Sequence, residues 1–281
     1  MIRVGVHVSI AGSINKAVDR AQEKGCDTFQ IFSRNPRGWK IKPLSDKEAS
    51  RFVEKREKSG IYPPVDHMPY LPNLAAPTGE IYDKSIAALT AELERCGALQ
   101  IPYLVTHLGS HRGSGEEGGL QQIVSAINTA FSEVENSVML LLENTAHTKN
   151  SMGGTFEHIR RIIDQIEHKD RIGICLDTCH AFVAGYELRT EASLEKTLQH
   201  FDDVLGLKQL TLIHLNDAKA GLGSKLDRHE HIGLGYIGED GFRVILHDER
   251  IMKLPMILET PVDDRRGDVE NLQKVRELAA H

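Results

Sequence analysis

Short runs of apolar and β-branched residues recur along the whole chain, and segments with helical periodicity lie between them. Strands that alternate with helices run parallel and are joined by right-handed crossovers. Eight such units predict an α/β fold closed into a (β/α)8 TIM barrel, and a doubly wound open sheet is the alternative topology. The predicted strands cover residues 4–8, 26–31, 65–67, 103–107, 138–143, 172–177, 210–214 and 256–259, and the predicted helices cover residues 13–24, 46–59, 81–96, 118–133, 155–166, 241–246 and 268–278.

The composition predicts one globular domain that spans residues 1–281. Hydrophobic residues make up 40% and charged residues 26%, enough to bury a core, and no Pro/Ser-rich linker divides the chain. No apolar stretch approaches the roughly 18 residues of a membrane span, and no signal peptide precedes the first strand, so we expect a cytoplasmic protein without a membrane partner. The cysteines are too scattered for a disulfide framework and are expected to be reduced: Cys26, Cys96, Cys175 and Cys179.

Six successive predicted strands end in residue types that bind metals. In a closed parallel barrel the carboxyl ends of the strands meet at one face, where the active sites of this fold lie. A lone strand-terminal His or Glu is more often a cap or a surface residue, but six in succession favour a shared site. The net charge of −6 argues against broad electrostatic coating of nucleic acid and is compatible with a local site. The six residues are His67, His107, Glu143, Asp177, His214 and Glu259; His7, which ends the first strand, is not expected to bind metal but can support the ligands.

Three further candidates lie in predicted loops on the same face. His180 follows Asp177 by three residues, and Asp227 and His229 lie on one side of an extended segment. The candidate set then contains five histidines and four carboxylates. One zinc ion takes about three or four protein ligands, so the set predicts a cluster of two or three ions, and we expect three. Cys179 lies between two candidates, but we expect its side chain to face away from them and to pack.

Five sequence motifs carry a resemblance to a known family. They read Leu142-Glu143-Asn144-Thr145-Ala146, Leu176-Asp177-Thr178-Cys179-His180-Ala181-Phe182, His214-Leu215-Asn216-Asp217, Asp227-Arg228-His229-Glu230-His231-Ile232-Gly233 and Leu258-Glu259-Thr260-Pro261. With them the chain resembles, from end to end, endonuclease IV, the zinc-dependent apurinic/apyrimidinic (AP) endonuclease of DNA base-excision repair. The chain departs from the family pattern where Leu108 replaces a proline, His147 a glycine and Ala218 a common serine. None of these changes removes a ligand.

The resemblance implies that all nine candidates bind a trinuclear zinc site, with manganese able to replace zinc at some positions. It also implies that Glu143 and Glu259 are the catalytic residues. The implied arrangement has Glu143 as the bridging carboxylate, His67 and His107 on one ion, Asp177, His214 and Glu259 on the second, and His180, Asp227 and His229 on the third.

The resemblance further implies a reaction and a substrate. The enzyme would hydrolyse the phosphodiester 5′ to an abasic site in double-stranded DNA by means of a hydroxide that bridges metal ions, leaving a 3′-hydroxyl and a 5′-deoxyribose phosphate, and would also trim blocked 3′ ends. Arg37, Tyr70 and Leu71, in loops 35–39 and 68–73, are implied to penetrate the DNA. From the residues alone, Tyr70 and Leu71 are more simply a hydrophobic plug over the barrel mouth. We expect a monomer with no obligate protein partner.

The strongest alternative is a sugar isomerase or epimerase on the same type of barrel. Such enzymes hold one divalent ion through a Glu, Asp, His and Glu at strand ends, and Glu143, Asp177, His214 and Glu259 match that set. The remaining five candidates have no purpose in a one-metal isomerase and therefore favour the endonuclease. A non-enzymatic metal-storage or DNA-binding module is the third hypothesis.

Overall fold

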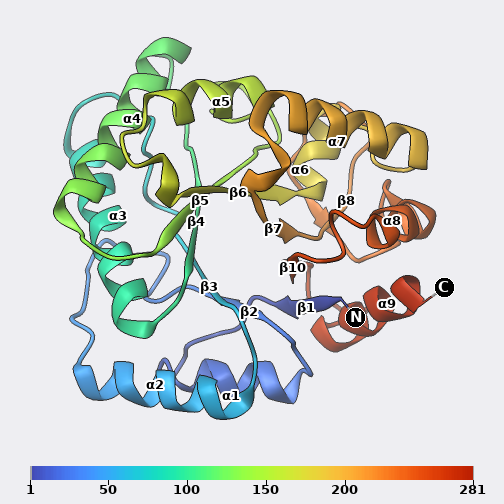
Figure 1. Ribbon diagram of the computed structural model, residues 1–281, viewed down its shortest axis with the longest axis horizontal. Coiled ribbons are helices and arrows are strands. Elements are labelled where there is room, and N and C mark those ends of the chain that lie inside the picture. Colours follow the sequence, from blue (N-terminus) through green and yellow to red (C-terminus); the bar gives the residue numbers. More distant parts are fainter. Residues whose placement is uncertain (1, 281) are drawn as a thin grey trace.

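Eight parallel strands form one sheet that curves into a barrel in the computed structural model, which describes residues 2–280 (Figure 1). Neighbouring strands follow the order β1-β10-β7-β6-β5-β4-β3-β2. All eight predicted strands are present, with small shifts at their ends. Their bounds are Arg3–Val6 (β1), Phe29–Ile31 (β2), Pro64–His67 (β3), Tyr103–His107 (β4), Met139–Glu143 (β5), Ile172–Asp177 (β6), Leu210–His214 (β7) and Pro255–Leu258 (β10).

The barrel closes between β1 and β2. A parallel bridge pairs His7 with Gln30, and the backbone N of Val8 donates to the backbone O of Gln30 at 2.8 Å. Gly5 permits this close approach, because a Cβ atom at its position would lie 1.6 Å from the backbone O of Thr28. Since the two ends of the sheet are hydrogen-bonded to each other, the TIM-barrel prediction is confirmed and the open-sheet alternative is wrong.

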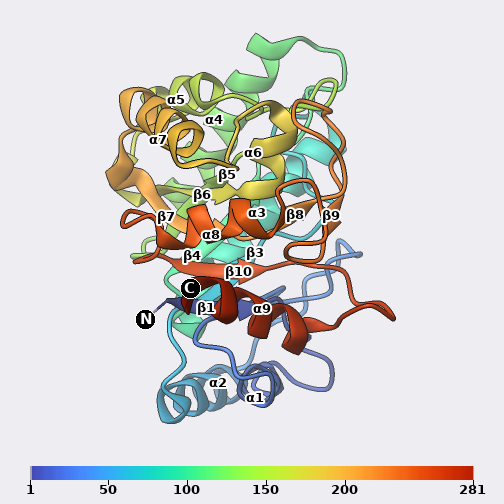
Figure 2. The ribbon, with the colours of Figure 1, turned by 90° about the vertical axis from the view of Figure 1, so that its right-hand side faces the viewer.

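Helices cover the outer face of the barrel (Figure 1 and Figure 2). The predicted helices are confirmed, but α6 and α7 were not predicted, although Thr190 and Ser193 form a capping box where α7 begins. Within residues 2–280, no helix is both long enough and apolar enough to span a membrane. The bounds are Lys16–Glu23 (α1), Asp46–Ser59 (α2), Glu80–Leu99 (α3), Glu116–Glu133 (α4), Phe156–Gln165 (α5), Thr178–Ala184 (α6), Glu191–Leu205 (α7), Gly238–His247 (α8) and Asp268–Ala280 (α9).

A small antiparallel hairpin follows β7. It pairs β8 (Asp217–Ala218) with β9 (His229–Glu230), which are too short to produce a periodic pattern in the sequence and were not predicted. The side view shows long loops extending beyond the strand ends on one side of the barrel (Figure 2). These loops and the hairpin surround the face where the predicted metal ligands lie.

Apolar side chains fill two separate spaces. The larger core lies between the strands and the surrounding helices, as parallel strands that are covered on both faces require. The smaller core fills the barrel interior, and six strands contribute one buried residue each to it. These six residues are Val65, Val105, Leu141, Cys175, Leu212 and Ile257. They form the floor on which the side chains nearer the C-terminal face rest.

Replacing Gly5 with alanine is expected to destabilise the protein by about 1–3 kcal/mol or more, because the new methyl group collides with the backbone of β2 at the barrel closure. The midpoint of urea unfolding measures the change. Gly118→Ala is the matched control, since Gly118 lies in α4 with only ordinary contacts around its Cβ position, and it should leave stability unchanged or raise it. An unchanged midpoint for Gly5→Ala would contradict the role given to this glycine.

Candidate metal centre

The period-two alternation of the strands aims the predicted ligands into the barrel. Each of the six strand-end candidates follows an interior apolar residue by two positions, so both side chains point to the same face. Five of the strands end at the predicted ligand, whereas β10 ends at Leu258 and Glu259 follows it. The pairs are Val65 and His67, Val105 and His107, Leu141 and Glu143, Cys175 and Asp177, Leu212 and His214, and Ile257 and Glu259.

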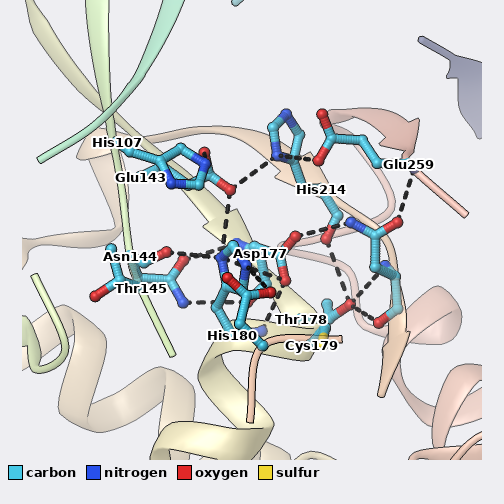
Figure 3. A network of polar contacts seen from close by, with 12 residues as sticks. His107, Glu143, Asn144, Thr145, Asp177, Thr178, Cys179, His180, His214 and Glu259 are labelled. Carbon is cyan, nitrogen blue, oxygen red and sulfur yellow. Dashed lines mark hydrogen bonds and ion pairs between the residues drawn. The ribbon is translucent and has the colours of Figure 1, made fainter. Parts of the chain in front are cut away.

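Glu143 is fully buried, and Figure 3 shows its carboxylate in contact with His214 and His180. Its Oε2 atom lies 3.3 Å from Nε2 of His67 and 3.0 Å from Nε2 of His107. Its Oε1 atom lies 3.1 Å from Nδ1 of His214 and 3.4 Å from Nδ1 of His180. One carboxylate therefore faces imidazoles from four parts of the chain, with its two oxygens pointing to different sides, as a bridging ligand would.

The ligand atoms gather into overlapping groups in which they lie within 4.8 Å of one another. Together these groups contain all nine predicted ligands, including Asp227 and His229, which the hairpin β8–β9 brings to the site. Three of the groups match the three sets that the family resemblance implies. They are His67, His107 and Glu143; Glu143, Asp177, His214 and Glu259; and His180, Asp227 and His229.

Hydrogen bonds fix which ring nitrogen of the histidines is free. Nδ1 of His67 donates to the backbone O of Met68 at 2.7 Å, and Nδ1 of His229 donates to the backbone O of Glu259 at 3.1 Å. The other nitrogen, Nε2, then presents a lone pair to the site. Among the described residues, the buried Nε2 of His229 has no hydrogen-bond partner, and it lies 3.5 Å from Oδ2 of Asp177. Imidazole lone pairs that face carboxylates need a cation between them, so the residues fit a metal.

Without a metal, protons on the histidines balance the negative charge of the carboxylates at this site. Burial lowers the pKa of His180, but Asp177 and Asp227 outweigh it and raise the pKa well above its ordinary value. Burial raises the pKa of Glu259, but the imidazoles of His214 and His67 outweigh it and lower the pKa to about 2. Burial likewise raises the pKa values of Glu143 and Asp227, but facing imidazoles outweigh it and lower them, so these three carboxylates are ionised at neutral pH and protonated imidazoles compensate their charge.

Two asparagines that the sequence reasoning did not single out hold the carboxylates in place. Nδ2 of Asn216 donates to Oδ2 of Asp177 at 2.8 Å, and Oδ1 of Asn216 accepts from the backbone N of Glu259, also at 2.8 Å. Oδ1 of Asn144 accepts from the backbone N of Asp177 at 2.7 Å. Their position inside the motifs, beside the ligands Glu143 and His214, was the available signal.

The expectation that Cys179 faces away from the ligands is wrong. The helix α6 begins directly after Asp177, and its first turn brings Sγ of Cys179 into one group with Asp177 and His229. Sγ also lies 3.6 Å from the backbone O of Arg228. Burial raises the pKa of the Cys179 thiol, which disfavours the thiolate that a metal would bind.

The three predicted DNA-binding residues lie on two loops that contact each other. Arg37 is exposed, and the side chains of Tyr70 and Leu71 are 66% and 38% exposed. The backbone N of Tyr70 donates to the backbone O of Pro36 at 3.2 Å, and the ring of Tyr70 packs edge-on against Phe32 with centroids 4.9 Å apart. These two contacts hold Tyr70 in place between the loops.

A buried ion pair anchors the first of these loops. Nε of Arg34 contacts Glu92, which is fully buried in α3, and Nη1 of Arg34 donates to the backbone O of Gly38 at 3.0 Å. Glu92 also accepts a hydrogen bond from the hydroxyl of Ser33. An ion pair with both partners buried and hydrogen-bonded restricts the backbone on either side of it.

Two cavities flank the ligands at this face. One of about 650 Å³ is lined by Trp39, Leu71 and Arg112 among others, and a second of about 420 Å³ is lined by Phe32 and Glu259 among others. Both volumes are within the range of ligand-binding pockets. The residues that line both cavities are His67, Tyr70, His107 and Asp227, so metal ligands and a predicted DNA-binding residue share the wall between them.

Comparisons with known proteins show the family to which the chain belongs. The model of a family described as xylose isomerase-like TIM barrel matches residues 18–281. The probable endonuclease 4 of Methanoculleus marisnigri is 61% identical over 280 residues, and that of Methanosphaerula palustris is 56% identical over 282 residues, each covering 99% of both chains. The crystal structure of endonuclease IV from Thermus thermophilus matches with a TM-score of 0.87 and 36% identity over 99% of both chains. The chain belongs to the endonuclease IV family.

Membership of the endonuclease IV family confirms the resemblance and the prediction that the chain is an enzyme of the endonuclease type. A D-tagatose 3-epimerase-like protein also matches, with a TM-score of 0.73 over 99% of this chain and 98% of its own. Its sequence identity is 18%, so this likeness shows the barrel fold alone.

Departures from the endonuclease IV pattern are accommodated by neighbouring glycines. Leu108 is fully buried, and a Cβ atom on Gly153 would lie 2.6 Å from its side chain. His147 has a positive φ of 57°, a conformation that suits the glycine usual in the family, and a Cβ atom on Gly154 would lie 2.7 Å from the His147 side chain. Ala218 pairs with His229 in the hairpin. His107, which precedes Leu108, lies in the ligand group with His67 and Glu143.

Binding of zinc to the metal-free protein at pH 7 is expected to release protons. Burial lowers the pKa values of His107, His180 and His214, but facing carboxylates, and for His214 first the sulfur of Cys175, outweigh it and raise them, so these histidines carry protons that a metal must displace. The apparent zinc affinity should therefore fall as the pH is lowered through these raised pKa values. Calorimetric titration in buffers with different ionisation enthalpies counts the released protons.

Two variants control this titration. His214→Gln should release fewer protons than the wild type, and His247→Gln, which removes an exposed histidine on α8, should release the same number. Binding heats that do not depend on the buffer would contradict the protonation given to the site.

Proposed function

We propose that this protein is an AP endonuclease that hydrolyses the phosphodiester 5′ to an abasic site in double-stranded DNA. The products would be a 3′-hydroxyl and a 5′-deoxyribose phosphate, and the same site would trim blocked 3′ ends. One observation carries the proposal: nine candidate ligand residues gather in overlapping groups around Glu143, in a chain of the endonuclease IV family. The whole of residues 1–281 would act as one domain and as a monomer.

The proposed cofactor is three zinc ions, one for each of the three groups of ligand atoms. Imidazole and carboxylate donors suit zinc, and manganese is the metal most able to replace it at the carboxylate-rich group. That group contains Glu143, Asp177 and Glu259 with only one histidine. The His180 group and the His67 group contain two histidines each and favour zinc.

Glu143 and Glu259 are proposed as the catalytic carboxylates. When bound, the metal ions supply Lewis-acid activation of water and neutralise charge on the phosphate. Glu143 joins two of the ligand groups and fixes the distance between them. Glu259 has a side chain that is 21% exposed and lines the smaller cavity, so its ionised carboxylate can contact the substrate and orient the attacking water.

Arg37, Tyr70 and Leu71 are proposed to hold the DNA by entering the base stack. An abasic nucleotide leaves the helix at low cost, since no base pair has to be broken at its position. An exposed aromatic ring and an aliphatic side chain can fill the space it leaves. The contact between the two loops supports this role, because a wedge must keep its shape while bases press on it.

The net charge of −6 does not prevent DNA binding in this proposal. Three divalent cations at the site outweigh the four carboxylates that bind them, so the occupied centre attracts a phosphate. Two nearby cations, Arg37 and Arg112, extend this positive region over the larger cavity and its rim.

A single-metal sugar isomerase or epimerase remains the second candidate. The group of Glu143, Asp177, His214 and Glu259 is the observation that favours it, because it is complete without the other five ligands. The buried, unpartnered Nε2 of His229 favours the endonuclease, since a one-metal site leaves this atom without a role.

Strand incision of a duplex with one tetrahydrofuran abasic analogue, without added magnesium, tests the proposal. The wild-type protein is expected to cut immediately 5′ to the lesion and to leave a 3′-hydroxyl, while an undamaged duplex stays intact. Glu143→Gln should lower the rate by about a hundredfold or more, because it removes the charge shared by two ligand groups. The surface variant Glu133→Gln is the matched control and should cut normally. If the zinc-loaded wild type leaves the lesion uncut, the endonuclease proposal fails and isomerase activity on ketoses and aldoses is measured.

Replacing Tyr70 and Leu71 with alanine is expected to raise the KM for abasic duplex by about tenfold or more, with kcat and the zinc content unchanged, because both side chains act in holding the DNA. Steady-state incision kinetics and elemental analysis measure these quantities. Tyr62→Ala is the control, since Tyr62 is also exposed but precedes β3 at the opposite face of the barrel. Kinetics of the double variant equal to those of the wild type would refute the wedge and favour the hydrophobic plug.

A further inference from the structure

We propose that Gln30 is a positioning residue for the ligand group of Glu143, Asp177, His214 and Glu259, through hydrogen bonds to His214 and Glu259. This inference rests on the proposed function. Gln30 belongs to β2, which contributes no metal ligand, and it is fully buried. It pairs in register with Val65, whose side chain fills the barrel interior, so Gln30 also points inward.

Both polar atoms of the Gln30 amide have partners at the site. Nε2 lies 2.6 Å from Oε1 of Glu259 and 3.1 Å from Nδ1 of His7, and Oε1 lies 2.8 Å from Nε2 of His214. The strands β2 and β7 and the residues that follow β1 and β10 thus meet at one side chain. His7, which the sequence suggested as a support for the ligands, reaches them through this amide.

The chemistry of the partners allows only one orientation of the amide. An ionised carboxylate only accepts hydrogen bonds, so the atom that faces Glu259 must be the NH2 group. A flipped amide would place two oxygens 2.6 Å apart with no proton between them. Oε1 of Gln30 therefore faces His214 and must accept a hydrogen from it.

This orientation decides the tautomer of His214. When a metal displaces one ring proton, the proton that stays lies on Nε2, where it is donated to Gln30, and Nδ1 is the nitrogen that offers its lone pair to the metal. Nδ1 is the atom that lies 3.1 Å from Glu143 and 3.4 Å from Glu259. The amide of Gln30 also donates to Oε1 of Glu259, so that Oε2 of Glu259 faces Nδ1 of His214. One uncharged side chain therefore presents two ligands of one group in the state that binds a cation.

Gln30→Met keeps the size of the side chain and removes these hydrogen bonds. Loss of such a partner typically lowers metal affinity by about 10- to 100-fold, so one equivalent of zinc should bind that much more weakly in the variant. Titration of metal-free protein with zinc against a chromophoric chelator measures each equivalent. Thr28→Val is the matched control, because it removes a buried hydrogen bond to the backbone O of Pro63 next to the same strand without touching the site, and its zinc affinity should equal that of the wild type.

A second measurement needs no variant. In zinc-loaded protein labelled with ¹⁵N in histidine, long-range ¹H–¹⁵N correlation should show the ring proton of His214 on Nε2, and a proton on Nδ1 would overturn the inference. With Gln30→Met, incision at limiting zinc should slow and recover when zinc is added in excess, with KM for the duplex unchanged. A purely structural defect would not recover in this way.

The outcomes separate this inference from the proposed function. If the wild type binds zinc and cuts the abasic duplex, but Gln30→Met binds every equivalent within about twofold of the wild type, the inference alone is wrong. If the wild type binds no zinc, both are wrong. Weakening confined to one equivalent, with Thr28→Val unchanged, supports the inference.

Discussion

The site depends on the charge of Glu143, a carboxylate buried inside the barrel. A buried charge costs several kcal/mol unless opposite charges and hydrogen bonds compensate it. Four imidazoles surround Glu143, and a proton or a metal ion at each contact supplies that compensation. Backbone carbonyls accept from Nδ1 of His67, His180 and His229, which leaves Nε2 of each of these rings free to face a cation.

The same alternation of side chains builds the apolar interior and the metal centre. Leu141 and Glu143 are two residues apart on β5, and the equivalent pairs on five other strand ends place six ligands above six apolar side chains. A slip of one residue in register would turn both layers out of the barrel at once. Packing of the interior and geometry of the ligands are therefore fixed by one set of strand pairings, and the closure at Gly5 completes that set.

Polar residues outside the candidate ligand set hold the candidate ligands in position. Asn216 links Asp177 on β6 to the residue after β10, and Asp217 accepts from the backbone N atoms of Gly233, Gly235 and Ile237. The contacts of Asp217 fold the loop beyond the hairpin that carries His229. The loop that carries Arg37 is anchored in turn by the buried pair of Arg34 and Glu92. The candidate ligands and the loops beside them are thus held by buried polar groups.

Much of the fold follows from the sequence, because strand and helix periodicities are local properties. The recurring apolar runs predicted the eight strands, and β4 and β7 end at the residues expected, His107 and His214. The hairpin β8–β9 escaped prediction, since two-residue strands form only when the chain around them is already folded. The start of α7 carried a capping signal at Thr190 that was not used.

By itself, the sequence determined the barrel, the family and the identity of the nine candidate ligands, because these depend on residue types and their spacing along the chain. Only the tertiary structure decided which atoms meet. It placed Cys179 near Asp177 and His229, brought Asn144 onto the backbone of Asp177 and Asn216 onto its carboxylate, and joined Gln30 to Glu259 and His7. These contacts join residues far apart in the sequence, and their distances and hydrogen-bond directions come from packing between strands, which no local pattern encodes.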